Sequence, residues 1–136
     1  MKIVVDTNVL VSGLWSPHGP PGEIVGMLAA GTLEACFDVR LLDEYREVLR
    51  RPRFAFTADE VGALLEQIEA RGHRIAARPL PRALPDPDDD AVLEIAVAAG
   101  ADFLITGNLR DFPLDRRHGV RVVDPRAFIE EFRKRQ

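Results

Sequence analysis

The stretch that decides the fold is Met1-Lys-Ile-Val-Val-Asp-Thr-Asn-Val-Leu10. Residues 3–5 are a β-branched run without a polar break, which is typical of a strand buried on both faces. The run ends in Asp6, Thr7 and Asn8, three small side chains that carry oxygen. In an open parallel sheet, ligands bind at the carboxyl ends of the strands. Asp6 is therefore either a ligand-binding residue or only the cap of the next helix, and this stretch alone leaves both readings open.

Length and composition predict one globular domain covering residues 1–136. The chain is 46% hydrophobic and 29% charged, which suits a soluble protein with a single sizeable core. No apolar run approaches the roughly 20 residues that span a bilayer, and the N-terminus lacks the pattern of a signal peptide. The single cysteine, Cys36, excludes an internal disulfide. We therefore expect a cytoplasmic protein that does not associate with membranes.

The formal net charge of −4 argues against bulk electrostatic attraction to nucleic acid. The charges are unevenly distributed, however, because acidic residues gather at positions 85–90. Two basic clusters stand elsewhere in the chain, and each is either a solvated face or a contact for phosphate. They consist of Arg50, Arg51 and Arg53, and of Arg116, Arg117, His118 and Arg121.

Alternating strand and helix patterns fill the rest of the chain. After the first strand, further strands are expected at 33–37, 73–77, 100–106 and 120–123. Helices are expected at 9–14, 23–30, 38–51, 57–72 and 87–99, with a terminal helix that starts at Asp124 and Pro125. This alternation predicts a three-layer α/β/α sandwich with a central parallel sheet of four to five strands.

Two helices carry carboxylates next to their apolar faces. In the helix at 38–51, Glu44 lies at the border of the apolar stripe, so it can reach inward or extend into water, and periodicity alone favours water. In the later helix, capped by Asp86, the wheel places Asp89 near the centre of the apolar face and Glu94 outside it. Asp88 and Asp90 fall on either side of Asp89. A capping role does not explain an inward Asp89, which indicates a functional partner.

A second strand end repeats the chemistry of the first. The apolar run at 103–105 ends in Thr106, Gly107 and Asn108, and Asp111 follows. Strand ends and the starts of the following helices share one edge of a parallel sheet, so the carboxylates would converge and raise one another's pKa values unless a cation neutralises them. Hard oxygen ligands select Mg²⁺ or Mn²⁺. Such a site is typical of enzymes that hydrolyse phosphodiester bonds with two metal ions.

Four segments, taken as a set, resemble the PIN-domain family of Mg²⁺-dependent ribonucleases, which includes VapC-type toxins of toxin–antitoxin pairs. They are Val-Val-Asp6-Thr-Asn-Val-Leu, Leu-Leu-Asp-Glu44-Tyr-Arg-Glu-Val-Leu, Asp-Pro-Asp-Asp89-Asp-Ala-Val-Leu and Leu-Ile-Thr106-Gly-Asn108-Leu-Arg-Asp111-Phe. They occur in family order over nearly the whole chain.

The resemblance implies a role for each matching position. Asp6 would be the central metal ligand, Glu44 and Asp89 would complete an acidic triad, and Asp111 would take the fourth acidic place. Thr7 and Thr106 would orient ligands or the nucleophile, and Asn8 would stand beside the metal. Many relatives carry Asp where this chain has Asn108, so this chain has one charge fewer there.

The resemblance also implies an RNA substrate, a cognate antitoxin and a homodimer, in which Trp15 is either an interface or a core residue. Arg46, Arg50, Arg110 and Arg117 are candidates for holding phosphate.

Other readings are weaker. A dinucleotide site lacks Gly-x-Gly-x-x-Gly after the first strand. Receiver-type and haloacid-dehalogenase-type sites lack the lysine they need, because only Lys2 and Lys134 are present. The remaining alternative is an inactive PIN-like module that binds RNA or protein, against which the filled acidic positions argue.

Overall fold

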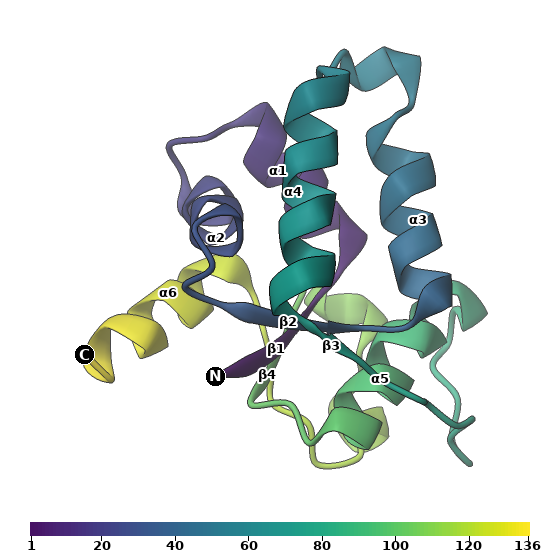
Figure 1. Cartoon of the computed structure of the whole chain (residues 1–136). Helices are drawn as coiled ribbons and strands as arrows, with labels where there is room; N and C mark the ends of the chain where they lie inside the picture. The colour runs from purple at the N-terminus through teal and green to yellow at the C-terminus, as the bar shows by residue number, and fades with distance from the viewer.

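A single sheet of five parallel strands forms the centre of the molecule (Figure 1). The computed structural model describes all residues from Met1 to Gln136. The strands lie in the order β3-β2-β1-β4-β5, with β1 in the middle. Their bounds are Lys2–Val5 (β1), Glu34–Phe37 (β2), His73–Arg74 (β3), Phe103–Ile105 (β4) and Val122–Val123 (β5). The predicted parallel α/β/α architecture is confirmed.

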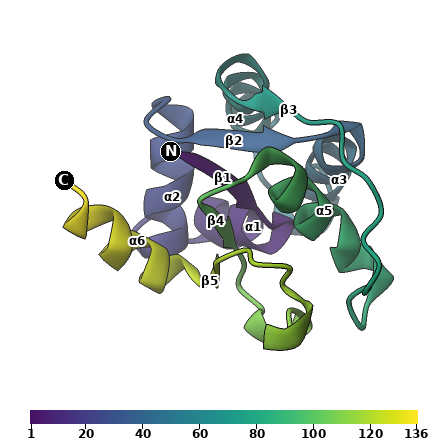
Figure 2. The ribbon, with the colours of Figure 1, turned by 90° about the horizontal axis from the view of Figure 1, so that it is seen from below.

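Six α-helices surround the sheet. They are α1 (Thr7–Trp15), α2 (Pro20–Ala29), α3 (Val39–Leu49), α4 (Ala58–Arg71), α5 (Asp90–Ala99) and α6 (Pro125–Lys134). In Figure 1, α5 lies on one side of the sheet, against β1, β2 and β4, and α2, α3 and α4 lie on the other. The view from below shows α6 beside α2, against which it packs (Figure 2). None of the helices combines the length and apolar character needed to cross a membrane.

The opening strand is buried as its sequence predicts. Ile3 and Val4 have no exposed surface, and Ile3 pairs with Ala35 on one side and Phe103 on the other. Both neighbours of β1 are thus apolar strands, which is why an uninterrupted β-branched run suits this position. The edge strands β3 and β5 have only two residues each. The short edges limit unpaired backbone at the sheet margin.

Short polar segments define where the helices start. The Asp6 carboxylate accepts the Thr7 N–H at 2.9 Å, so α1 begins two residues before the predicted helix at 9–14. Thr57 and Glu60 form a capping box at the start of α4. Side-chain caps at these starts fix where each helix leaves the sheet.

The predicted helix start at Pro87 is wrong in detail. Residues Pro87–Asp89 form a 3-10 turn capped by Asp86, and α5 begins at Asp90. A 3-10 turn advances by a different angle per residue, so the helical wheel does not apply to Asp89. The predicted outward position of Glu94 is also wrong. Glu94 is 9% exposed and pairs with Arg40 at 2.9 Å, which supplies the countercharge that burial requires.

Candidate active site

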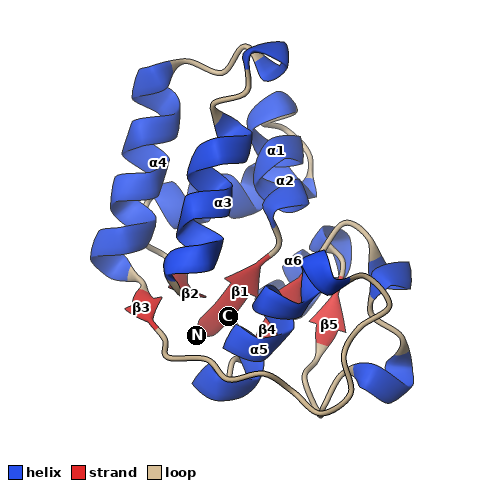
Figure 3. Ribbon diagram, turned by 90° about the vertical axis from the view of Figure 1, so that its right-hand side faces the viewer, coloured by secondary structure: helices blue, strands red, loops and turns tan.

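The candidate site lies at the carboxyl ends of the neighbouring strands β1 and β4 (Figure 3). Asp6 follows β1, and its backbone N–H donates to the Ile105 carbonyl at 2.9 Å. Thr106 follows β4, is fully buried, and donates its hydroxyl to Asp6 Oδ2 at 2.9 Å. Parallel pairing of the two strands therefore brings together two side chains that are separated by 100 positions in the sequence.

Asp6 is a buried carboxylate without a countercharge. Only 9% of the residue is exposed, and its partners are neutral groups of Thr7, Asn8 and Thr106. Burial raises the pKa of Asp6, hydrogen bonds from Thr106 and Thr7 oppose that shift, and the negative charges of Glu44 and Asp111 add to it. Asp6 is thus both helix cap and member of an acidic group.

Glu44 reaches this group from α3. The residue is exposed, yet its carboxylate accepts the hydroxyl of Thr7. The neighbouring Tyr45 is fully buried and donates its hydroxyl to the Val5 carbonyl. This second bond ties α3 to the end of β1, so the Glu44 carboxylate is directed to the strand end while its stem stays in water. The sequence alone did not predict this role of Tyr45.

Asp89 faces the same group from the 3-10 turn before α5. Its pKa is raised to about 7 by burial and then by the charges of Asp6 and Asp111. Its Oδ2 atom is buried without a hydrogen-bond partner. Asp88, by contrast, is exposed, and Asp90 accepts the backbone N–H of Leu84 at 3.0 Å. Of the three consecutive aspartates, Asp89 is therefore the one with a free, buried oxygen on the site side.

The loop after β4 brings in the last acidic residue. Asn108 donates its amide to Asp111 Oδ2 at 2.8 Å and its backbone N–H to the Thr106 hydroxyl at 3.1 Å. Asn8 accepts the N–H of Gly107 at 2.9 Å, which fastens this loop to α1. A Cβ at position 107 would lie 3.2 Å from the Asn8 amide oxygen, so a side chain there would crowd Asn8. Glycine permits this close approach. The sequence shows Gly107 directly after Thr106, but the contact with Asn8 was not predicted from it.

Comparison with known proteins identifies the family. Residues 2–110 match the profile of the PIN domain, which covers more than half of the chain. The protein belongs to the PIN domain family. Members of this family are generally nucleases, act on nucleic acids and typically use divalent metals. The chain is also 27% identical to an uncharacterized protein of Methanocaldococcus jannaschii, over 98% of this chain and 93% of that protein.

The carboxylates of this PIN domain suit a hard cation by their chemistry. All the donors are carboxylate, amide and hydroxyl oxygens, and the orphaned Oδ2 of Asp89 is a ready ligand atom. None of the four acidic residues Asp6, Glu44, Asp89 and Asp111 takes part in an ion pair. No three His, Cys, Asp or Glu side chains are gathered closely enough to hold a metal between them. The donor set therefore fits a hard cation in its chemistry, although the carboxylates are not gathered around one point.

The four arginines proposed to hold phosphate differ in availability. Arg46 pairs with Asp43 at 3.2 Å, and Arg117 donates to the Phe112 carbonyl at 2.8 Å. Arg50 and Arg110 are exposed and make no ion pair or side-chain hydrogen bond. These two arginines remain free to meet a phosphate.

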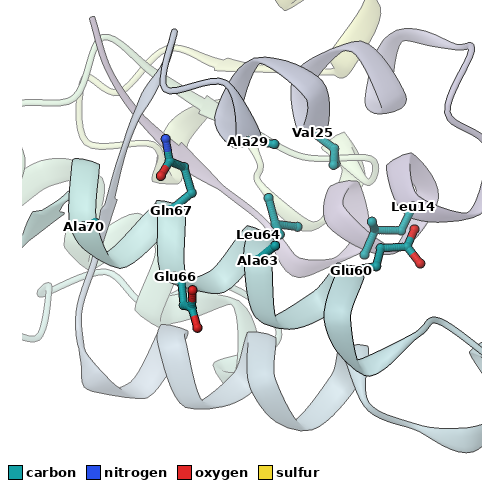
Figure 4. A pocket seen from close by; sticks show the side chains of 9 residues that line it. All are labelled: Leu14, Val25, Ala29, Glu60, Ala63, Leu64, Glu66, Gln67 and Ala70. Atoms are coloured by element: carbon teal, nitrogen blue, oxygen red, sulfur yellow. The ribbon is translucent and has the colours of Figure 1, made fainter.

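A separate hollow of about 550 Å³ lies between α1, α2 and α4 (Figure 4). Most of its lining is apolar, and none of the predicted site residues takes part. The nine lining residues are Leu14, Val25, Ala29, Glu60, Ala63, Leu64, Glu66, Gln67 and Ala70. The acidic group therefore lies outside this hollow.

Proposed function

We propose that this PIN domain is an endoribonuclease that depends on Mg²⁺ or Mn²⁺. The observation that carries the proposal is the group of carboxylates at the ends of β1 and β4 without a basic partner. Asp6 and Asp89 both have raised pKa values because they are buried beside other acids. An arrangement that disfavours its own charge is costly to the metal-free fold and is characteristic of functional sites.

A bound divalent cation supplies charge neutralisation, polarisation of the phosphoryl oxygen and activation of water. The ligands would be Asp6, Glu44, Asp89 and Asp111, with Asn8 beside them.

The chain's own residues orient these carboxylates. Thr106 holds one oxygen of Asp6, Thr7 holds Glu44, and Asn108 holds Asp111. Each support is a neutral donor, so no positively charged side chain competes with a cation for these carboxylates. Both oxygens of Asp6 accept hydrogen bonds, whereas Glu44 and Asp111 each keep one oxygen without a hydrogen bond. Oδ2 of Asp89 has no hydrogen-bond partner either.

The test is cleavage of single-stranded RNA by wild type and by Asp6→Asn, with Mg²⁺ and with EDTA. We expect cleavage only by wild type in Mg²⁺, restored when Mg²⁺ is added back after EDTA. Asp43→Asn is the matched control, because Asp43 is an exposed acid beside Glu44 that pairs with Arg46. Equal cleavage by Asp6→Asn would assign the activity to a contaminant. RNA binding without cleavage in Mg²⁺ or in Mn²⁺ would instead favour an inactive binding module.

We further propose that the nuclease acts as the toxin of a toxin–antitoxin pair and works as a homodimer. The support is the likeness of its four motifs to VapC-type toxins. Expression of wild type should arrest growth, expression of Asp6→Asn should not, and the product of a small neighbouring gene should relieve the arrest. Unimpaired growth with wild type, under conditions where the purified protein cleaves RNA, would contradict the toxin role.

A further inference from the structure

A cluster of three aromatic rings stands at the far end of α1 from the acidic group. Trp15 is the last residue of α1, and its ring meets those of Phe54 and Phe56 edge-on, with centroids 6.1 and 6.2 Å apart. Phe54 and Phe56 stack on each other at 5.5 Å with an interplanar angle of 11°. We call these three residues the aromatic platform. Trp15, the only tryptophan, is 61% exposed, so the platform presents a large ring to solvent.

The platform is built on fixed backbone. Phe54 ends a 3-10 turn that begins at Pro52, and Phe56 directly precedes Thr57, the side-chain cap of α4. Between the two phenylalanines, Ala55 has a left-handed backbone with φ of 56°. A non-glycine residue in this region is strained, because its Cβ crowds the backbone. The conformation places the two phenyl rings parallel, and such local strain is often kept at functional positions.

Positive charge borders the aromatic platform. The Arg53 guanidinium lies 4.9 Å from the centroid of the Phe54 ring, a cation–π contact. Arg50 is exposed and has no ion pair, while Arg51 pairs with Glu47 at 2.8 Å. Of the three rings only that of Trp15 is exposed, while Phe54 and Phe56 are half-buried. Proteins bind single-stranded nucleic acid with aromatic rings beside arginines, because bases stack on the rings and arginines contact the phosphates. An apolar protein partner would not call for these charges.

The two helices that carry the acidic group also lead to the platform. α1 runs from Thr7 at the site to Trp15, about 12 Å at 1.5 Å per residue. α3 carries Glu44 and ends just before the turn that holds Phe54, and α1 packs against α3. A single strand with its bases stacked about 3.4 Å apart covers this distance with about three to four nucleotides. The platform is thus within reach of a strand whose phosphate lies at the acidic group.

We propose that the aromatic platform stacks an unpaired base of the substrate a few nucleotides from the cleaved bond. The inference rests on the proposed nuclease function for its choice of ligand. A duplex hides the faces of its bases, so the platform discriminates against paired substrate. The arginines beside it add attraction that weakens with salt.

Trp15 reports on this contact directly, since it is the only tryptophan and the only tyrosine, Tyr45, is fully buried. The experiment titrates the full chain in EDTA with oligouridylate and follows tryptophan fluorescence. A parallel titration uses the same oligomer annealed to oligoadenylate. We expect saturable quenching by the single strand and little by the duplex. No quenching, or equal quenching by both forms, would overturn the proposal.

Variants separate stacking from charge and from folding, with affinity measured by the anisotropy of a labelled oligouridylate. Trp15→Ala should weaken binding about tenfold, because it removes the ring on which a base stacks, and Trp15→Phe should recover much of the loss. Arg53→Ala should weaken binding and reduce its salt dependence. The exposure of Trp15 makes loss of the fold unexpected, and circular dichroism checks this. Unchanged affinity in Trp15→Ala would overturn the proposal.

Two further outcomes are distinguishable. If Trp15→Ala dissociates a dimer in sedimentation and leaves RNA affinity unchanged, the platform is a contact between copies of this chain and the proposal fails. If the single strand quenches Trp15 but wild type never cleaves RNA with Mg²⁺, the proposed nuclease activity fails while the platform stands.

Discussion

Two buried carboxylates in this molecule have the same exposure and opposite surroundings. Asp6 and Glu94 are each 9% exposed. Glu94 faces Arg40 at 2.9 Å, and the same guanidinium binds Asp38, the cap of α3, at 2.7 Å. Asp6 faces neutral donors and further acids. A carboxylate buried with a countercharge fixes helices in place, whereas Asp6, which is buried beside other acids without a countercharge, belongs to the proposed metal site.

The difference predicts opposite consequences for replacing each acid. Neutralising an acid in the Asp6 group relieves repulsion in the metal-free protein but removes a ligand. Disturbing the Arg40 pair leaves a buried charge without a partner and leaves the nuclease site intact. The predictions below test this contrast.

The largest effect is expected on cleavage. Glu44→Gln, Asp89→Asn and Asp111→Asn should each lower kcat/KM about a hundredfold or more, because a lost metal ligand removes several kcal/mol of charge stabilisation. Glu94→Gln should leave kcat/KM within about threefold of wild type, since changes away from the site are mostly small. Initial rates of cleavage of a fluorogenic RNA in Mg²⁺ give kcat/KM for all four variants and for wild type. An equal loss in Glu94→Gln would erase the distinction between the two carboxylates.

The next effect is on stability. Arg40→Met leaves the buried Glu94 carboxylate without a countercharge and should lower the free energy of unfolding by about 1–3 kcal/mol. The half-exposed Arg40 keeps the loss at this level rather than higher. Asp6→Asn should instead raise the stability of the metal-free protein. Urea titrations in EDTA at neutral pH provide both values, and the double variant Arg40→Met/Glu94→Leu should recover part of the loss. Destabilisation by both single variants would contradict the contrast.

A pH effect should separate the two sites further. The pKa of Asp89 is raised from 3.8 to about 7, so the folded metal-free protein holds this proton more tightly than the unfolded chain. The stability that this group contributes is therefore greatest at acidic pH and is lost as pH rises from about 4 to about 7.

Urea titrations in EDTA at several pH values should show this decline in wild type and not in Asp89→Asn, so that the difference isolates one group. Mg²⁺ should suppress the decline, because a cation binds the deprotonated carboxylate. A parallel pH profile in the two proteins would show that Asp89 is not the group responsible.

The smallest effect is expected at Asn108, whose amide donates to Asp111 at 2.8 Å. Asn108→Asp replaces this donor by a second carboxylate. It should lower the stability of the metal-free protein slightly, through repulsion, and lower the Mg²⁺ concentration for half-maximal cleavage a few-fold. Asp115→Asn offers a comparison at an exposed acid of the same loop region, which pairs with Arg82. If both variants lowered the Mg²⁺ concentration for half-maximal cleavage, the effect would not be specific to position 108.

The sequence alone predicted the parallel sheet and a shared edge for the strand ends at Asp6 and Thr106, whereas the pairing of β1 with β4 that joins these two residues came from the structure. Strand periodicity is local, and the shared edge of parallel strands follows from it. The sequence could not predict where the Glu44 side chain points, because a helical wheel describes one helix by itself. The orientation of α3 on the sheet depends on the hydrogen bond from Tyr45 to the Val5 carbonyl. Nor could the sequence distinguish the 3-10 turn at Asp89 from a first helical turn, since both accept the same capping residues.

What the sequence determined by itself is the chemistry at each strand end, since the acids, threonines and asparagines there are fixed by position. Only the tertiary structure decided which charges are compensated. Arg40 reaches Glu94 across 54 residues, and Trp15 at the end of α1 contacts Phe54 and Phe56 in the segment before α4. Such long-range contacts depend on how helices pack on the sheet, and no local periodicity records them.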